Sequence, residues 1–262
     1  MYAPDHPTAS SYDDIVDFYD TWTSMSATAQ NDTEFYAEHC LHHAGPILEL
    51  GVGTGRIAVN LAERGATVVG VDLSPRMLSA ALRRASERGV AHRLTLCATD
   101  FSVWLPNCQP AAIYAPFHAL SHLPHLGAVR STLRLAAALL EPGGTFAFNV
   151  PHQCSEHIAE LDGVEQLVTD TAAGAARLRV TVTVHADHVN RRQASTVHGT
   201  LREPQGRALL EHRWDLPLIW ISTAEIENEA AVTGFEVESV AHQFSPTGAL
   251  FPDEKVVVLR RR

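Results

Sequence analysis

The chain has 262 residues, of which 45% are hydrophobic, so residues 1–262 can form a single domain with a sizeable core. A formal charge of −10 argues against a nucleic acid partner, because phosphate binding needs clustered lysine and arginine side chains. The four cysteines form no C-x-x-C pair and no apolar stretch reaches the roughly 20 residues that span a bilayer, which predicts a cytoplasmic protein without membrane contact.

Residues 1–45 have helical periodicity in two places. Apolar spacing predicts helices over residues 12–22 and 32–42. The small and polar residues 23–31 between them predict a hinge. We therefore expect this part of the chain to act as a helical lid.

The stretch from Ile47 to Asp72 indicates a site for a nucleoside cofactor. A short apolar strand, a glycine turn, an amphipathic helix and a second apolar strand follow one another there. Gly51, Gly53 and Gly55 let the backbone approach a ligand without a Cβ in the way, and the next helix directs free N–H groups at that ligand. Asp72 ends the second strand, where ribose hydroxyls would arrive.

The glycine spacing narrows the choice of cofactor. A dinucleotide motif needs glycine at position 56, where this chain has Arg56, and a P-loop needs a Gly-Lys pair, whereas the only lysine is Lys255. A nicotinamide-dependent oxidoreductase is therefore disfavoured. The turn has the form E-x-G-x-G-x-G from Glu49 to Gly55.

Strands and helices continue to alternate through a core that we assign to residues 46–160. Ser74 with Pro75 predicts the start of a helix. The other predicted core elements are strands over 93–97, 111–115 and 145–150 and a helix over 127–140. This alternation predicts an α/β fold with a doubly wound, mostly parallel sheet.

Residues 161–221 alternate apolar and polar positions with period two, which predicts an antiparallel β insertion. We expect its strand edges and the aromatic Trp214 and Trp220 to cover the active site or to form the interface of a homo-oligomer.

Residues 222–262 predict a helix capped by Ser222, a closing hairpin and a solvated tail of three arginines.

Over residues 47–151 these motifs resemble the class I S-adenosylmethionine-dependent methyltransferases. The resemblance rests on the glycine turn, the acidic strand end at Asp72, the pair Asp100-Phe101 and the sequence Glu141-Pro-Gly-Gly. It implies a Rossmann-like sheet of seven strands with the last one antiparallel. It also implies S-adenosyl-L-methionine as cofactor and S-adenosyl-L-homocysteine as product.

The resemblance assigns cofactor contacts position by position. The three glycines would lie under the methionine part and Asp72 on the ribose, while Asp100 and Phe101 would hold the adenine and Leu73 and Met77 would pack on its other side. The full set implied is Tyr19, Glu49, Gly51, Gly53, Gly55, Asp72, Leu73, Met77, Asp100, Phe101 and Ala115.

A narrower resemblance involves the lid and the insertion. Tyr12 and Tyr19, each with an aspartate neighbour, together with an antiparallel insertion look like the small-molecule N-methyltransferases. That group includes glycine N-methyltransferase and the amino-sugar and lincosamide N-methyltransferases of antibiotic pathways. In amino-sugar N-methyltransferases an aromatic residue precedes a histidine by five positions, as Phe117 precedes His122 here.

Methyl transfer from a sulfonium is an in-line displacement, so the protein must hold the acceptor atom roughly 3 to 3.5 Å from the methyl carbon. His122 would serve as base or orienter for an amine. Tyr12 and Tyr19 would close over the sulfonium, and Phe117 would form part of the substrate wall. Plain packing of the tyrosines and a histidine without chemistry remain open alternatives.

Two patterns argue against other sites. The sequence APFH after the fourth strand departs from the [DNS]-P-P-[YFW] motif of methyltransferases that act on nucleic acid amino groups. His118, His122 and His125 have metal-like spacing, but Pro124 interrupts the helix that would align them, so we expect no metal site.

The sequence therefore predicts an S-adenosylmethionine-dependent N-methyltransferase that acts on an amine of a small molecule, such as an antibiotic intermediate. The alternative is O-methylation of a small hydroxylated metabolite, which would use the same cofactor site. A cofactor-binding partner or regulator without activity is a third possibility, against which the lid tyrosines and the histidine after the fourth strand argue.

Overall fold

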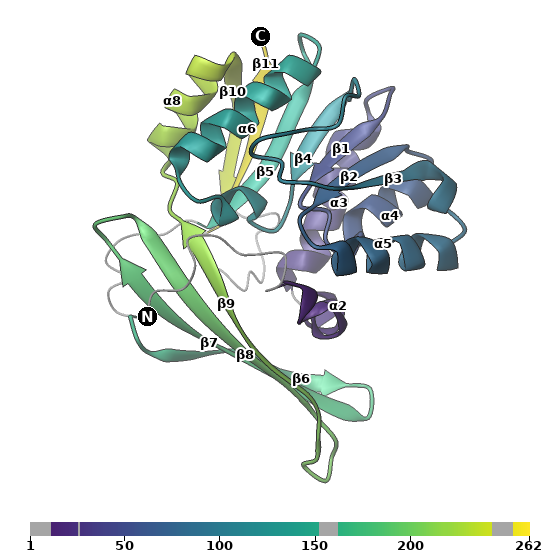
Figure 1. Ribbon diagram of the computed structural model, residues 1–262, viewed down its shortest axis with the longest axis vertical. Helices are drawn as coiled ribbons and strands as arrows, with labels where there is room; N and C mark the ends of the chain where they lie inside the picture. The colour runs from purple at the N-terminus through teal and green to yellow at the C-terminus, as the bar shows by residue number, and fades with distance from the viewer. Residues whose placement is uncertain (1–11, 26, 152–161, 243–253) are drawn as a thin grey trace.

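The computed structural model describes residues 12–25, 27–151, 162–242 and 254–262. These residues form two β-sheets with flanking helices, and the second sheet projects below the first in Figure 1. The larger sheet has seven strands in the order β10-β11-β5-β4-β1-β2-β3, which confirms the predicted doubly wound α/β fold. The predicted boundary between core and insertion lies outside the described residues.

Five strands of the larger sheet are parallel: β1 (Ile47–Leu50), β2 (Val68–Asp72), β3 (Leu94–Ala98), β4 (Ala112–Ala115) and β5 (Thr145–Pro151). The other two are β10 (Phe235–His242) and β11 (Glu254–Arg261). β11 is antiparallel to both of its neighbours, as the resemblance implied. Every residue of β1, β4 and β5 is buried, because helices cover both faces of a parallel sheet.

The covering helices are α3 (Ala27–Leu41), α4 (Arg56–Glu63) and α5 (Pro75–Glu87) on one face and α6 (Leu126–Leu139) and α8 (Thr223–Thr233) on the other (Figure 1). Their ends follow the predicted signals. Ser74 caps α5 by accepting a hydrogen bond from the Met77 amide, and Ser222 forms a capping box with Glu225. Among the described helices, none combines the length and the apolar character needed to cross a membrane.

The C-terminal arginines do not form the predicted solvated tail. Arg261 lies within β11, and its guanidinium donates to the carbonyl oxygens of Ala137 and Gly234 at 3.1 and 2.7 Å. Arg260 pairs with Glu238 at 2.6 Å. The apolar residues of β11 end at Leu259, whereas its backbone pairing with β10 continues to Arg261. The hydrophobic pattern therefore did not indicate that the arginines belong to the strand.

The lid consists of α2 (Val16–Met25) and α3. The helix boundaries predicted at residues 22 and 32 are wrong, since α2 continues to Met25 and α3 already begins at Ala27, while a hinge at this place stays a prediction. Thr23 shows why the polar stretch misled the prediction: its hydroxyl donates to the carbonyl oxygen of Tyr19 at 2.9 Å, within the helix itself.

The insertion forms the predicted antiparallel sheet, with β6 (Glu165–Ala173), β7 (Ala176–Asp187), β8 (Arg192–Arg202) and β9 (Ala208–Ile219) in that order. Its inner face packs against α2. The Trp214 ring lies 5.5 Å from Phe18 and 5.8 Å from Trp22, measured between ring centroids. Phe18 also lies directly over Gly199, where a Cβ would overlap its ring. The insertion therefore supports the lid.

Candidate active site

A cavity lies under the lid at the carboxyl ends of β1 to β4, which is where open α/β sheets bind ligands. Its lining residues are Tyr12, Tyr19, Gly51, Gly53, Asp72, Leu73, Ser74, Met77, Asp100, Phe101, Ser102, Pro116, Phe117, Ala119, His122, Leu123 and Pro124. The sequence analysis missed the small residues and prolines of these turns, which carry no motif of their own. No residue of the insertion is among the described lining residues, so the expected cover by that sheet is indirect.

Asp72 holds the glycine turn in place. Gly51 and Gly53 have φ angles of 74° and 52°, which glycine adopts without strain. Oδ2 of Asp72 accepts a hydrogen bond from the Gly53 amide at 2.8 Å, and Oδ1 accepts one from the Ser74 amide at 2.9 Å. Burial raises the pKa of Asp72, and these two amides act in the opposite direction. Asp72 thus joins the turn after β1 to the start of α5.

Glu49 lies inside the core and is not among the residues that line the cavity, so the cofactor contact assigned to it stays a prediction. Its side chain is 2% exposed, and Oε2 accepts a hydrogen bond from the Tyr114 hydroxyl at 2.6 Å. Burial raises the pKa of Glu49 to about 8, so the carboxyl group is mostly protonated at neutral pH. The motif spacing indicated a carboxylate near the turn but not the direction in which it points.

Gly55 and Ala115 support the cavity wall and are not among its lining residues, so the two contacts assigned to them stay predictions. Gly55 caps α4 at a φ of 74°, and a Cβ there would lie 2.9 Å from that of Ala81 in α5. This glycine therefore permits close helix packing. Ala115 is fully buried at the end of β4 and precedes Pro116, which does line the cavity.

The residues predicted for the adenine lie together at the β2 and β3 ends of the cavity. Oδ1 of Asp100 accepts hydrogen bonds from the amide and hydroxyl of Ser102 at 2.8 and 2.7 Å, which fixes the orientation of the carboxylate. Phe101 adjoins it. Leu73 and Met77 belong to the same wall, and Leu73 is 43% exposed while Met77 is buried.

The four residues predicted to be catalytic form one cluster on the lid side. The rings of Tyr12 and Tyr19 meet edge to face with centroids 6.4 Å apart. Phe117 lies edge-on to Tyr19 at 6.3 Å and to Trp22 at 5.7 Å. The Tyr12 hydroxyl is 3.0 Å from Nε2 of His122.

The electrostatics of this cluster keep both partners of that hydrogen bond uncharged. Burial lowers the pKa of His122 to about 4; nearby His118 acts in the same direction and the backbone of Pro217 in the opposite one. The imidazole is therefore uncharged at neutral pH. Burial also raises the pKa of Tyr12 well above its usual value, so its O–H remains, and it donates to Nε2 in the tautomer of His122 that carries its proton on Nδ1. The lone pairs of the Tyr12 oxygen stay available at the cavity.

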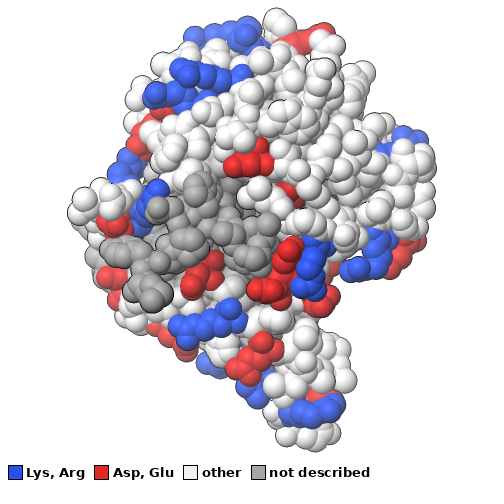
Figure 2. Space-filling view, in the orientation of Figure 1, with Lys and Arg blue, Asp and Glu red and all other residues white. Residues whose placement is uncertain are grey.

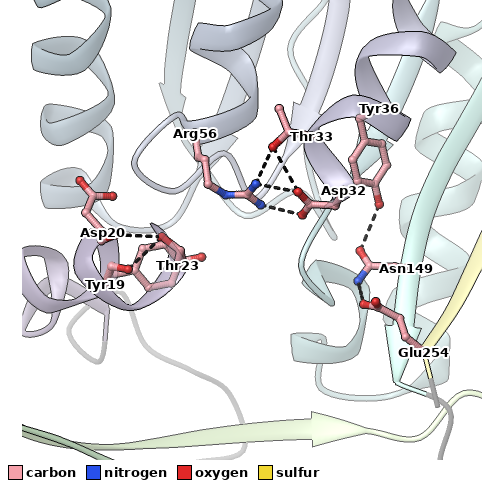
Figure 3. A network of polar contacts seen from close by, with 9 residues as sticks. All are labelled: Tyr19, Asp20, Thr23, Asp32, Thr33, Tyr36, Arg56, Asn149 and Glu254. Atoms are coloured by element: carbon pink, nitrogen blue, oxygen red, sulfur yellow. Dashed lines mark hydrogen bonds and ion pairs between the residues drawn. The ribbon is translucent and has the colours of Figure 1, made fainter. Parts of the chain in front are cut away.

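Ion pairs hold the lid over the cavity, a feature that the sequence analysis missed. Figure 3 shows Arg56 of α4 paired through two nitrogens with Asp32 of α3, each at 2.6 Å. Asp20 of α2 accepts a hydrogen bond from the Thr54 hydroxyl in the glycine turn at 2.5 Å and pairs with Arg84 of α5 at 2.9 Å. The only sequence signal was the arginine at position 56.

The three histidines with metal-like spacing have separate partners. His118 bonds to Oε1 of Glu254 at 2.8 Å, and His125 caps α6 by accepting a hydrogen bond from the Ala128 amide at 3.0 Å. His122 faces the lid tyrosine. In the part of the chain that the structure describes, no three His, Cys, Asp or Glu side chains converge on a point that would hold a metal ion.

Residues 47–144 match the methyltransferase domain family. The release factor glutamine methyltransferase of Moorella thermoacetica is 32% identical over 160 residues, which cover 50% of this chain and 56% of that protein. The ubiquinone biosynthesis O-methyltransferase of Vibrio parahaemolyticus is 28% identical over 123 residues, which cover 47% and 51%. The chain thus spans about half the length of the curated relatives it matches.

Solved structures match most of the chain. The CcbJ methyltransferase from Streptomyces caelestis has a TM-score of 0.75 at 24% identity, covering 96% of this chain and 98% of that one. CalS10, an amino pentose methyltransferase from Micromonospora echinaspora, has a TM-score of 0.70 at 20% identity, covering 88% and 90%. Residues 47–144 are therefore similar to a methyltransferase domain, and the chain has the fold of these solved methyltransferases.

Proposed function

We propose that the protein is an S-adenosylmethionine-dependent N-methyltransferase that methylates an amine of a small molecule, such as an intermediate of antibiotic biosynthesis. The observation that carries this proposal is the bond between Tyr12 and a neutral His122, in a cavity that also presents Asp72 and Asp100. The structural neighbour CalS10, an amino pentose methyltransferase, supports an acceptor of this kind.

The charge of the cavity lining favours cationic ligands. Asp72 and Asp100 are acidic, and none of the described lining residues is a lysine or an arginine. A sulfonium and a protonated amine both carry positive charge and are attracted to such a cavity. Figure 2 shows basic and acidic side chains interspersed over the visible face, without one continuous basic surface. We therefore propose a small-molecule acceptor and no nucleic acid partner.

The residues that line the cavity fit S-adenosylmethionine. Asp72 would accept hydrogen bonds from the ribose hydroxyls, and the backbone at Gly51 and Gly53 leaves room for the methionine part. Asp100 and Phe101 would hold the adenine. The bound cofactor supplies a methyl group activated by the positive sulfur.

Tyr12 is the residue that we assign to orienting the acceptor amine. With the His122 proton on Nδ1, the Tyr12 O–H is donated to His122, and the lone pairs of the Tyr12 oxygen can accept an N–H of the amine and turn the nitrogen lone pair toward the methyl group. With a pKa of about 4, His122 is a poor proton acceptor for an ammonium group, so we assign it to holding Tyr12. The amine then loses its proton to water before it reacts.

O-methylation of a hydroxylated metabolite is the second candidate. The relative from Vibrio parahaemolyticus is an O-methyltransferase, and the Tyr12 oxygen can orient a hydroxyl as it can an amine. A hydroxyl holds its proton more tightly than an ammonium group and needs a stronger base during transfer. The lowered pKa of His122 disfavours it as that base, which is why we place N-methylation first.

Transfer of a labelled methyl group to matched acceptors tests the proposal. Each pair of acceptors differs only in an amino or a hydroxyl group on the same carbon, for example an amino sugar and its parent sugar. We expect mass spectrometry to find the label on nitrogen, and we expect Tyr12→Phe to lower kcat while cofactor affinity is retained. Tyr36→Phe, which removes a hydroxyl remote from the cavity, is the matched control.

Each outcome of this experiment decides one question. Label on oxygen alone would favour the second candidate. Calorimetry showing no binding of S-adenosylmethionine or its demethylated product would overturn both enzymatic candidates. Binding without transfer to any acceptor of the panel would favour a cofactor-binding protein without activity.

We propose further that the chain works in a reducing cytoplasm and forms a homo-oligomer through the second sheet. Cys40, Cys97 and Cys108 are free thiols, which fits that compartment. The outer face of the sheet carries polar pairs such as His198 with Glu211, so the open edges of β6 and β9 are the surfaces left for pairing. A monomer at every concentration in light scattering would remove the assembly proposal.

A further inference from the structure

We infer that His118 and Glu254 are positioning residues, which hold Phe117 in the cavity wall through a strained turn at the end of β4. The inference rests on the proposed function, because it concerns the wall around the bound methyl donor. Neither His118 nor Glu254 lines the cavity, so they act on it through neighbouring residues: through Phe117, and through the electrostatic influence of His118 on His122.

The turn after β4 has an unfavourable backbone conformation. Phe117 and His118 have φ angles of 52° and 63°, in the left-handed region that a residue with a Cβ disfavours. Within the described residues, the only other non-glycine residue with positive φ is Arg191, between β7 and β8. Two consecutive residues of this kind persist only where surrounding contacts hold them, and such strain is typical of functional sites.

A buried chain of hydrogen bonds supplies those contacts. His118 is 6% exposed, and its Nε2 donates to Oε1 of Glu254 at 2.8 Å. The Asn149 amide donates to the same oxygen, and the Tyr36 hydroxyl donates to Oδ1 of Asn149 at 3.0 Å. Figure 3 shows Tyr36, Asn149 and Glu254 following one another from α3 across β5 to β11. The carboxylate that receives His118 is therefore itself fixed.

The anchored imidazole supports the ring that lines the cavity. The Phe117 ring stacks on that of His118 with an interplanar angle of 17° and a centroid distance of 5.9 Å. Its edges meet Tyr19 and Trp22 of the lid. Loss of the anchor would release both the backbone turn and the support under the ring, and Phe117 would leave the wall.

Two substitutions of the same histidine separate positioning from stability. His118→Ala removes the hydrogen bond to Glu254, and alanine still has a Cβ, which disfavours positive φ. His118→Gly removes the same anchor but adopts that φ freely. Glycine leaves the larger hole, so a merely structural role predicts that His118→Gly is impaired at least as much as His118→Ala. A positioning role predicts the reverse order.

Calorimetric titration with S-adenosylmethionine and S-adenosylhomocysteine gives a readout that needs no acceptor. An aromatic ring face stabilises a cation, so displacing Phe117 weakens binding of the sulfonium more than binding of the uncharged thioether. We expect the ratio of the two affinities to fall roughly fivefold in His118→Ala and by less in His118→Gly. Glu254→Gln can still accept the bond from His118 and should resemble wild type, whereas Glu254→Ala should resemble His118→Ala.

His198→Ala, which removes a histidine from the outer face of the second sheet, is the control and should leave the ratio unchanged. An unchanged ratio in His118→Ala, or equal ratios in His118→Ala and His118→Gly, would overturn the inference. A crystal structure of His118→Ala in which Phe117 keeps its positive φ would do the same. A wild-type protein that binds neither compound would instead overturn the proposed function, so the two failures are distinguishable.

Discussion

The lowered pKa of His122 predicts a specific pH dependence of the free energy of unfolding. In the folded protein this residue binds a proton near pH 4, whereas an unperturbed histidine does so near about 6.5. Between these values the unfolded chain binds more protons, so stability is lost as the pH falls through this window. The full shift corresponds to about 3 kcal/mol, of which about 2 kcal/mol is lost between roughly pH 7.5 and pH 5.

Urea denaturation of wild type and His122→Gln at these two pH values measures the effect. Glutamine can still accept the hydrogen bond from Tyr12, but it does not titrate. Wild type should lose about 2 kcal/mol more than the variant on acidification. Other titrating groups contribute alike to both proteins, so the difference isolates His122. Parallel pH dependence of the two proteins would refute the buried neutral imidazole and with it the orienting role.

Three further substitutions test separate parts of the structure. Asp72→Ala should weaken S-adenosylmethionine binding by about tenfold or more in calorimetry, because the ribose contact and the bond to the Gly53 amide are both lost. Unchanged affinity would contradict the role assigned to Asp72. Gly199→Ala should lower the free energy of unfolding by about 1–3 kcal/mol, because its Cβ would overlap the Phe18 ring. Adding Phe18→Leu should restore part of that loss. A thermal melt like that of wild type would speak against this packing. The stability gained by Glu49→Gln relative to wild type should increase as the pH rises to about 8. The reason is that the carboxyl group ionises near pH 8 in the folded protein but at lower pH in the unfolded chain. The opposite trend would indicate an ionised carboxylate in the core.

The features that could be predicted from sequence are those with local causes. Apolar periodicity located the core strands, and the side-chain chemistry of Ser74 and Ser222 located two helix starts, because caps act within one helical turn. The glycine turn and Asp72 were predicted together because they follow β1 and end β2, two parallel strands whose carboxyl ends lie side by side. The family resemblance assigned Tyr12 and His122 to the same site, but their hydrogen bond, which joins positions 110 apart, was not predicted.

The features that escaped prediction depend on the tertiary arrangement. A strand sequence does not say which face of the sheet Glu49 points to, and its buried bond to Tyr114 exists only because β1 and β4 are neighbours. The pair of Arg56 and Asp32 joins two helices whose contact no local pattern encodes. The helix boundaries predicted within the lid were wrong because polar side chains can form hydrogen bonds within a helix.

The support of α2 by the second sheet has a consequence for how such a catalyst can diversify. Phe18 and Trp22 rest on the sheet, while Tyr12 and Tyr19 of the same segment face the cavity. Substitutions in the second sheet can therefore change how firmly α2 is held over the cavity, and with it the rate of product release. They do so without changing a residue that lines the cavity. Variant libraries that aim at faster turnover can therefore begin with residues of the second sheet.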